Sequence, residues 1–146
     1  MTVDTTPNAL RERQVRVDAP TERRRGRASE IRVLIVDDDA RFRALARTVL
    51  IARGYTIAAE AADGAQARAA ARRVHPDAAL VDVRLPDADG LALARELTGI
   101  DPRMRILLTS TDQALGTHRA LTSRPTVGFV PKDELAITDL KPWLGG

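Results

Sequence analysis

The stretch RVLIVDDD, residues 32–39, sets the fold, because a short apolar run leads directly into three aspartates. An apolar run without alternation predicts a strand that is covered on both faces, as in a parallel sheet. Residues 78–81 and 106–108 have the same character and predict two more buried strands. Residues 56–60 are more mixed, and residues 127–130 are followed by a proline, so we expect these two strands at the sheet edges.

Helical spacing of apolar residues, together with capping signals, predicts one helix after each strand. Aspartates stand at the expected starts of these helices, and glycine or an X-Pro pair stands near the expected ends of the first three. The five predicted helices have the limits 39–54, 63–75, 89–99, 112–121 and 133–144.

Regular alternation of strand and helix predicts an α/β fold, in which right-handed crossovers place helices on both faces of a parallel sheet. With the two less regular strands at the edges, the strand order is 2-1-3-4-5 in chain numbering. This order is that of a doubly wound, flavodoxin-like (βα)5 fold. We expect residues 30–146 to form this domain.

Residues 1–29 lack periodicity and are rich in Arg, Thr and Pro. Such a segment buries too little apolar surface to offset its ordering entropy, so we expect a disordered, Arg-rich tail. A basic anchor for RNA, lipid or a partner, and a wrongly assigned start codon, are the two alternative explanations.

Composition removes several classes of function. The chain has no cysteine and two histidines, which excludes disulfides and Cys-based zinc sites and disfavours a His-rich metal site. No apolar run is long enough for a membrane span or a secretory signal, so a cytoplasmic location is expected. Residues 1–30 carry a net charge of +2 and the remainder only +1, which argues against a direct nucleic-acid-binding face.

Polar residues with complementary chemistry follow four of the predicted strands. Asp37 and Asp38 follow the first strand, Asp82 follows the third, Thr109 ends the fourth and Lys132 follows the fifth. Ligands of doubly wound sheets gather at these carboxyl ends, so the carboxylates should converge and require a cation. With oxygen ligands only, the expected cation is Mg²⁺. The full set suits phosphoryl transfer to an aspartate.

Four sequence blocks carry a family resemblance: IVDD at 35–38, LVDVRLPDADG at 80–90, LLTS at 107–110 and GFVPK at 128–132. In their order and spacing they resemble the receiver domains of bacterial response regulators, over residues 31 to about 144. Any single block is weak, whereas the four together are specific. The resemblance implies a phosphorylation switch of a two-component system.

The resemblance also implies residue roles by position. Asp82 would be the phosphoacceptor. Asp37, Asp38 and Asp82 would hold Mg²⁺, and the backbone carbonyl of Arg84 would complete the protein ligands. Asp39 adds a third consecutive acid, and we interpret it as a helix cap rather than as a metal ligand.

Three further residues take roles from the resemblance. Thr109 would hydrogen-bond the phosphoryl group and Lys132 would pair with it. Phe129 matches the aromatic switch position, whose ring would turn inward as Thr109 moves toward the phosphate. Asp133 follows Lys132 where many relatives have proline, so the usual cis peptide is in doubt here.

As a receiver, the protein would take its phosphoryl group from a sensor histidine kinase or a histidine phosphotransfer protein. We expect no external substrate, hence no enzyme beyond its own phosphorylation and dephosphorylation. We expect no output domain after the fifth helix, and we therefore expect a downstream protein target that the sequence does not name. A weak homodimer through the last helices and a truncated transcription factor stay open.

Three other functions compete with this interpretation. A Mg²⁺-dependent phosphohydrolase of the haloacid-dehalogenase type would use Asp37-x-Asp39, but the chain lacks the following Thr or Val and a cap insertion. A dinucleotide-binding domain would need a Gly-x-Gly-x-x-Gly segment after the first strand. A degenerate receiver used only for protein interaction would have lost Asp82 or Lys132, and both are present.

Overall fold

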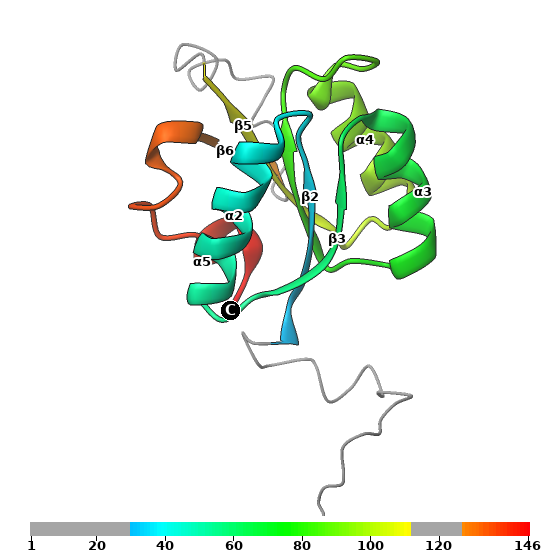
Figure 1. Ribbon diagram of the computed structural model, residues 1–146. Helices are drawn as coiled ribbons and strands as arrows, with labels where there is room; N and C mark the ends of the chain where they lie inside the picture. Colours follow the sequence, from blue (N-terminus) through cyan, green and yellow to red (C-terminus); the bar gives the residue numbers. More distant parts are fainter. Residues whose placement is uncertain (1–29, 112–126) are drawn as a thin grey trace, which may run out of the picture.

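Five parallel strands form one sheet in the order β3-β2-β4-β5-β6 (Figure 1). The computed structural model describes residues 30–111 and 127–146 of the chain. The strands are β2 (Arg32–Val36), β3 (Thr56–Ala61), β4 (Ala78–Asp82), β5 (Arg105–Ser110) and β6 (Val127–Pro131). Counted along the chain, this order is 2-1-3-4-5, so the predicted topology is confirmed.

Helices cover both faces of the sheet (Figure 1). Their limits are α2 (Ala40–Ala52), α3 (Gly64–Val74), α4 (Gly90–Ile100) and α5 (Lys141–Leu144), with a 3-10 helix η4 (Lys132–Glu134) after β6. α2 and α5 lie on one face, whereas α3 and α4 lie on the other. No helix in the described parts of the chain is both long and apolar enough to cross a membrane.

The apolar runs of the central strands feed two separate cores. Within β2, Val33 and Ile35 face the core beneath α2, while Leu34 and Val36 face the core beneath α3 and α4. All four are 0–1% exposed. Because successive strand residues point to opposite faces, only a continuous apolar run can fill both cores.

Aspartate side chains cap the helices that begin near the carboxyl ends of the strands. Asp39 accepts a hydrogen bond from the Arg41 amide, so it caps α2 as predicted. The end predicted for α4 at Gly99 is wrong by one residue. The helix continues to Ile100 and stops at Asp101, whose backbone is extended, as expected for a residue that precedes proline.

The predicted helix over residues 133–144 is wrong: the segment contains η4, a turn and the four-residue α5. Thr138 and Asp139 compete with the helix by bonding nearby backbone groups. The Thr138 hydroxyl donates to the Glu134 carbonyl at 2.7 Å, and the Asp139 carboxylate accepts from the Lys141 amide at 3.2 Å. Pro142 has no amide hydrogen, so it fits only the first turn of the restarted helix α5. The peptide after Lys132 is trans.

Two other predictions, the tail at 1–29 and the helix at 112–121, lie outside the described residues.

Candidate functional site

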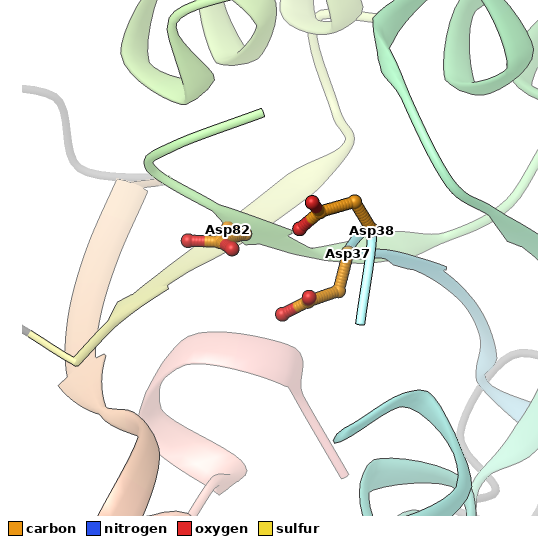
Figure 2. A group of neighbouring side chains, drawn as sticks. All are labelled: Asp37, Asp38 and Asp82. Carbon is orange, nitrogen blue, oxygen red and sulfur yellow. The ribbon is translucent and has the colours of Figure 1, made fainter. Parts of the chain in front are cut away.

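The acidic residues lie at the carboxyl ends of two neighbouring strands. β2 is followed by Asp37 and Asp38, whereas β4 ends on Asp82 itself. Val36 pairs with Val81 in the parallel register, which brings the next residue of each strand side by side. Figure 2 shows the three side chains grouped at this end of the sheet.

The three carboxylates are close enough to share one cation. One oxygen atom from each of Asp37, Asp38 and Asp82 lies within 4.8 Å of the others. Asp37 is fully buried and Asp82 is 6% exposed, whereas Asp38 is exposed and opens the cluster to solvent. Carboxylate oxygens at this spacing are the hard ligands that Mg²⁺ prefers, so the donor set fits this ion.

Lys132 forms ion pairs with two of the three carboxylates. Its ammonium lies 2.7 Å from Asp37 Oδ2 and 3.1 Å from Asp82 Oδ2. Below it, the Phe42 ring centroid is 4.7 Å from Nζ, which is a cation–π contact. Lys132 is placed there because β6 lies next to β5 and ends level with it.

Burial and ion pairing compete in this group. Burial raises the pKa of Asp37 above its usual value, and the neighbouring Lys132 offsets this only in part. For Lys132, burial acts to lower the pKa, but its contacts with Asp37 and Asp82 together outweigh burial, so the pKa of Lys132 is raised. One ammonium therefore does not fully compensate the buried negative charge.

Thr109 carries a buried polar atom that has no hydrogen-bond partner in the described part of the chain. β5 pairs with β4 so that Thr109 lies opposite Asp82, and Thr109 is fully buried. Among the described residues its hydroxyl oxygen Oγ1 has no hydrogen-bond partner. An unsatisfied buried hydroxyl costs free energy, and in native structures such a group often marks a binding site.

The loop from β4 to α4 folds tightly around Asp82. The Arg84 amide donates to Asp82 Oδ1 at 3.1 Å, and Arg84 forms an isolated β-bridge with Asp89. The Gly90 amide donates to the Val83 carbonyl at 2.7 Å. A Cβ at position 90 would lie 2.2 Å from the Asp82 carbonyl oxygen, so glycine is required for this approach. The role of the Arg84 carbonyl as a metal ligand stays a prediction.

Phe129 lies next to the site on the face that α3 and α4 cover. It pairs with Leu108, the residue before Thr109, and its partly buried side chain packs against the core on that face. Its predicted role as a switch depends on a second state, and it stays a prediction.

Sequence reasoning missed three residues around the cluster. Phe42 lies under Lys132, and Arg43 donates to the Asp37 carbonyl at 2.7 Å. Asp87 accepts from the amides of the first two residues of α3, at 2.7 and 3.1 Å, and these hydrogen bonds lower the pKa of Asp87. A signal existed for the first two residues, since they fall in the first turn after the Asp39 cap.

The fold and the site define an α/β protein with an acid cluster, a lysine and a hydroxyl at the carboxyl ends of a 2-1-3-4-5 sheet. A family model described as the response regulator receiver domain matches residues 33–141. The chain therefore belongs to the receiver-domain family of two-component response regulators.

Individual relatives agree with this membership. The chemotaxis protein CheY of Bacillus subtilis is 37% identical over 79 residues, which cover 54% of this chain and 66% of that protein. A protein-glutamate methylesterase of Anaeromyxobacter dehalogenans is 40% identical over 93 residues, which cover 63% of this chain but 27% of the relative. The solved signal receiver domain of NarL from Mycobacterium tuberculosis is 31% identical, with a TM-score of 0.61, covering 73% of this chain and 90% of that one.

Proposed function

We propose that this protein is a phosphorylation switch that accepts a phosphoryl group on Asp82 and signals through a change of its surface. The observation that carries the proposal is the fully buried Thr109 hydroxyl, which has no hydrogen-bond partner among residues 30–111 and 127–146. It lies opposite Asp82, at the end of the sheet that holds Lys132. A phosphoryl oxygen would be an acceptor for this hydroxyl. The donor would be a histidine kinase or a histidine phosphotransfer protein.

In the proposed reaction, a carboxylate oxygen of Asp82 attacks the phosphorus atom of a phosphohistidine. The new O–P bond forms as the P–N bond breaks, and the departing imidazole nitrogen keeps the electron pair of that bond. Hydrolysis of the acyl phosphate later restores Asp82 and releases inorganic phosphate. The carboxylate is oriented in advance, because the Arg84 amide holds Oδ1 and Lys132 contacts Oδ2.

The neighbouring side chains have complementary roles in this proposal. Thr109 would donate its hydroxyl hydrogen to one phosphoryl oxygen, and Lys132 would exchange part of its contact with Asp82 for a second oxygen. Both groups act at low exposure, since Thr109 is fully buried and the Lys132 side chain is 15% exposed. Electrostatic interactions there are stronger than in bulk water.

We propose that Asp37, Asp38 and Asp82, with the Arg84 backbone carbonyl, hold Mg²⁺. When bound, Mg²⁺ supplies charge neutralisation for the phosphoryl oxygens. The three carboxylates support this assignment because they lie close together, whereas the Lys132 ammonium pairs with two of them. Exposed Asp38 leaves a route for the ion and for the phosphodonor.

Signal output would follow from the movement of Thr109 toward the phosphoryl group. Phe129 would turn inward in response and reshape the surface around β5 and β6, which a downstream protein would read. We propose that this happens in the cytoplasm and without an external substrate. The methylesterase relative does not argue against this, because the match spans only 27% of that protein.

Intact-mass spectrometry after incubation with acetyl phosphate and Mg²⁺ tests the proposal. The wild type should gain one phosphoryl group, the Asp82→Asn variant none, and chelation of the metal should prevent the gain. An adduct that survives in Asp82→Asn would identify another nucleophile. A wild type that never gains mass from acetyl phosphate or from a phosphorylated histidine kinase would overturn the proposal.

A further inference from the structure

Arg43 on α2 reaches the backbone of the acid cluster. Its guanidinium Nη1 donates to the main-chain carbonyl of Asp37 at 2.7 Å. The Arg43 side chain is 21% exposed, so this hydrogen bond is partly shielded from water. The carbonyl belongs to the peptide that joins Asp37 to Asp38, the two acids that follow β2.

Glu60 on β3 holds Arg43 in this position. Arg43 Nε lies 3.3 Å from Glu60 Oε1, and Arg47 Nη2 lies 2.6 Å from Glu60 Oε2. Glu60 is the one charged residue of β3, where the other five residues are Thr, Ile and Ala. The carboxylate thus joins two arginines of α2 to the neighbouring edge strand, and only Arg43 continues to the cluster.

Three hydrogen bonds and one ion pair reach Asp37 from different directions. Its amide donates to the Ala61 carbonyl at 3.0 Å, and its Oδ1 accepts from the Asp39 amide at 2.8 Å. Oδ2 has the ion pair with Lys132, and the carbonyl has Arg43. The Asp38 side chain, by contrast, is exposed and has no hydrogen bond or ion pair with the described residues, so its direction depends on the peptide that precedes it.

We infer that Arg43 is a positioning residue for the cation site: by fixing the Asp37–Asp38 peptide, it directs the exposed Asp38 carboxylate toward Asp37 and Asp82. The inference rests on the proposed function, because it concerns the same Mg²⁺ site. It goes further by assigning a role to a residue that touches neither the ion nor the phosphoryl group. Partners that orient metal ligands typically change affinity when they are removed.

Charge alone predicts the opposite sign of effect. Arg43 is a cation close to a cation site, so its removal should strengthen Mg²⁺ binding if only Coulomb repulsion mattered. If Arg43 positions Asp38, its removal should weaken Mg²⁺ binding. The Asp38 carboxylate would then have to be ordered when the ion binds, and this ordering costs free energy. The sign of the change therefore separates the two explanations.

The test is calorimetric titration of the unphosphorylated full chain with Mg²⁺, together with thermal unfolding without the metal. Arg43→Met keeps the apolar stem, and we expect its Mg²⁺ affinity to fall roughly 10-fold. Arg47→Met is the matched control, because this variant also loses an ion pair with Glu60, while Arg47 makes no hydrogen bond to the Asp37 carbonyl. Its Mg²⁺ affinity should stay at the wild-type level. Arg43→Lys keeps the positive charge, but an ammonium lacks the planar guanidinium that contacts the Asp37 carbonyl and Glu60 at the same time. This variant should bind Mg²⁺ with intermediate affinity.

The outcomes are distinct for the inference and for the proposed function. An Arg43→Met variant that binds Mg²⁺ as tightly as the wild type, or more tightly, overturns the inference alone. A wild type that binds no Mg²⁺ overturns the inference and the proposed metal site together. If Arg43→Met does not fold, Glu60→Gln takes its place, and the expected result is a smaller loss of affinity in the same direction.

Discussion

The two ends of the sheet differ in how their charged and polar groups are paired. At the amino ends of the strands, the Arg32 guanidinium donates to the carbonyls of Val74 and His75 at 2.7 and 3.1 Å, and Asp77 accepts from the Arg32 amide at 2.8 Å. The Tyr55 hydroxyl donates to the Gly145 carbonyl at 2.6 Å. At the carboxyl ends, three carboxylates lie close together, the Lys132 ammonium pairs with two of them, and a buried hydroxyl has no partner among the described residues.

This difference indicates that residues at the amino ends contribute to stability, whereas residues at the carboxyl ends serve ligand binding. At the amino ends, Arg32, Asp77 and Tyr55 form hydrogen bonds with other groups of the chain. Changes to these residues should therefore lower stability and leave ligand binding intact. The carboxyl ends concentrate like charge at a cost in stability, and under the proposed function a bound cation and a phosphoryl group would offset that cost. The predictions that follow alter one end at a time.

The largest effect is expected for Lys132→Met, which removes the ammonium and leaves Asp37 buried without a counter-charge. Loss of one partner of a buried pair should lower the free energy of unfolding by about 3 kcal/mol. Mg²⁺ should raise the melting temperature of this variant by more than that of the wild type, because the ion can replace the missing positive charge. Thermal unfolding with and without Mg²⁺ measures both effects.

Lys141 supplies the matched control, because it is the only other lysine and is exposed. Lys141→Met should unfold like the wild type in both conditions. A Lys132→Met variant of wild-type stability would show that the acid cluster does not depend on its ammonium.

At the opposite end, Arg32→Met removes two hydrogen bonds from a charged donor to the carbonyls at the end of α3. We expect a loss of about 2 kcal/mol in urea unfolding. The loss should be equal with and without Mg²⁺, because Arg32 is remote from the cation site. Arg103→Met, at a side chain that is 85% exposed, should change nothing. A change in the Mg²⁺-dependent part of stability would contradict the separation of the two ends.

Tyr55→Phe deletes one hydrogen bond at the amino ends and should cost about 1 kcal/mol at pH 8. Burial, followed by the nearby Asp139 charge, raises the pKa of Tyr55 above its usual 10.0. The stability that the hydroxyl contributes is therefore fully present below pH 10 and is lost as the pH rises through the raised pKa. The difference between wild type and variant should shrink as the pH rises above 10, and a constant difference would exclude this role of the hydroxyl.

The smallest change in the free energy of unfolding is expected for Asp37→Asn. Unlike the preceding variants, it should raise the stability. Burial raises the pKa of Asp37, so the folded protein loses stability as the pH rises from 3.8 through the raised pKa. Above the raised pKa, the amide should restore about 0.5 kcal/mol. The gain should vanish below pH 4, and Mg²⁺ binding should be lost. Asp38→Asn, at an exposed side chain, should lose Mg²⁺ binding without a gain in stability.

The strands and their order could be predicted because the decisive signals are local. The apolar runs that include Val33–Val36 and Leu80 mark strands that are covered on both faces, and the less regular strands mark the edges. The approach of Asp37 and Asp82 then follows from topology, since carboxyl ends of neighbouring parallel strands meet.

The other features of the site and of the last helix could not be predicted, because they depend on side-chain contacts that no local sequence pattern indicates. The hydrogen bond from Arg43 to the Asp37 carbonyl and the packing of Phe42 under Lys132 join segments through side-chain reach. The break in the last helix depends on Thr138 and Asp139, which bond the backbone in place of the helix. Sequence periodicity registers the apolar residues of that segment and does not register this competition.

The measurement that tests the central claim most directly is the location of the phosphoryl group. The protein is phosphorylated with Mg²⁺ and acetyl phosphate and then reduced with borohydride, which converts an aspartyl phosphate into homoserine and releases phosphate. Tandem mass spectrometry of the digested chain reads the position. We predict homoserine at position 82 only, and its absence when Mg²⁺ is removed. Homoserine at position 37 or 38, or none in a protein that carries a phosphoryl group, would contradict the account.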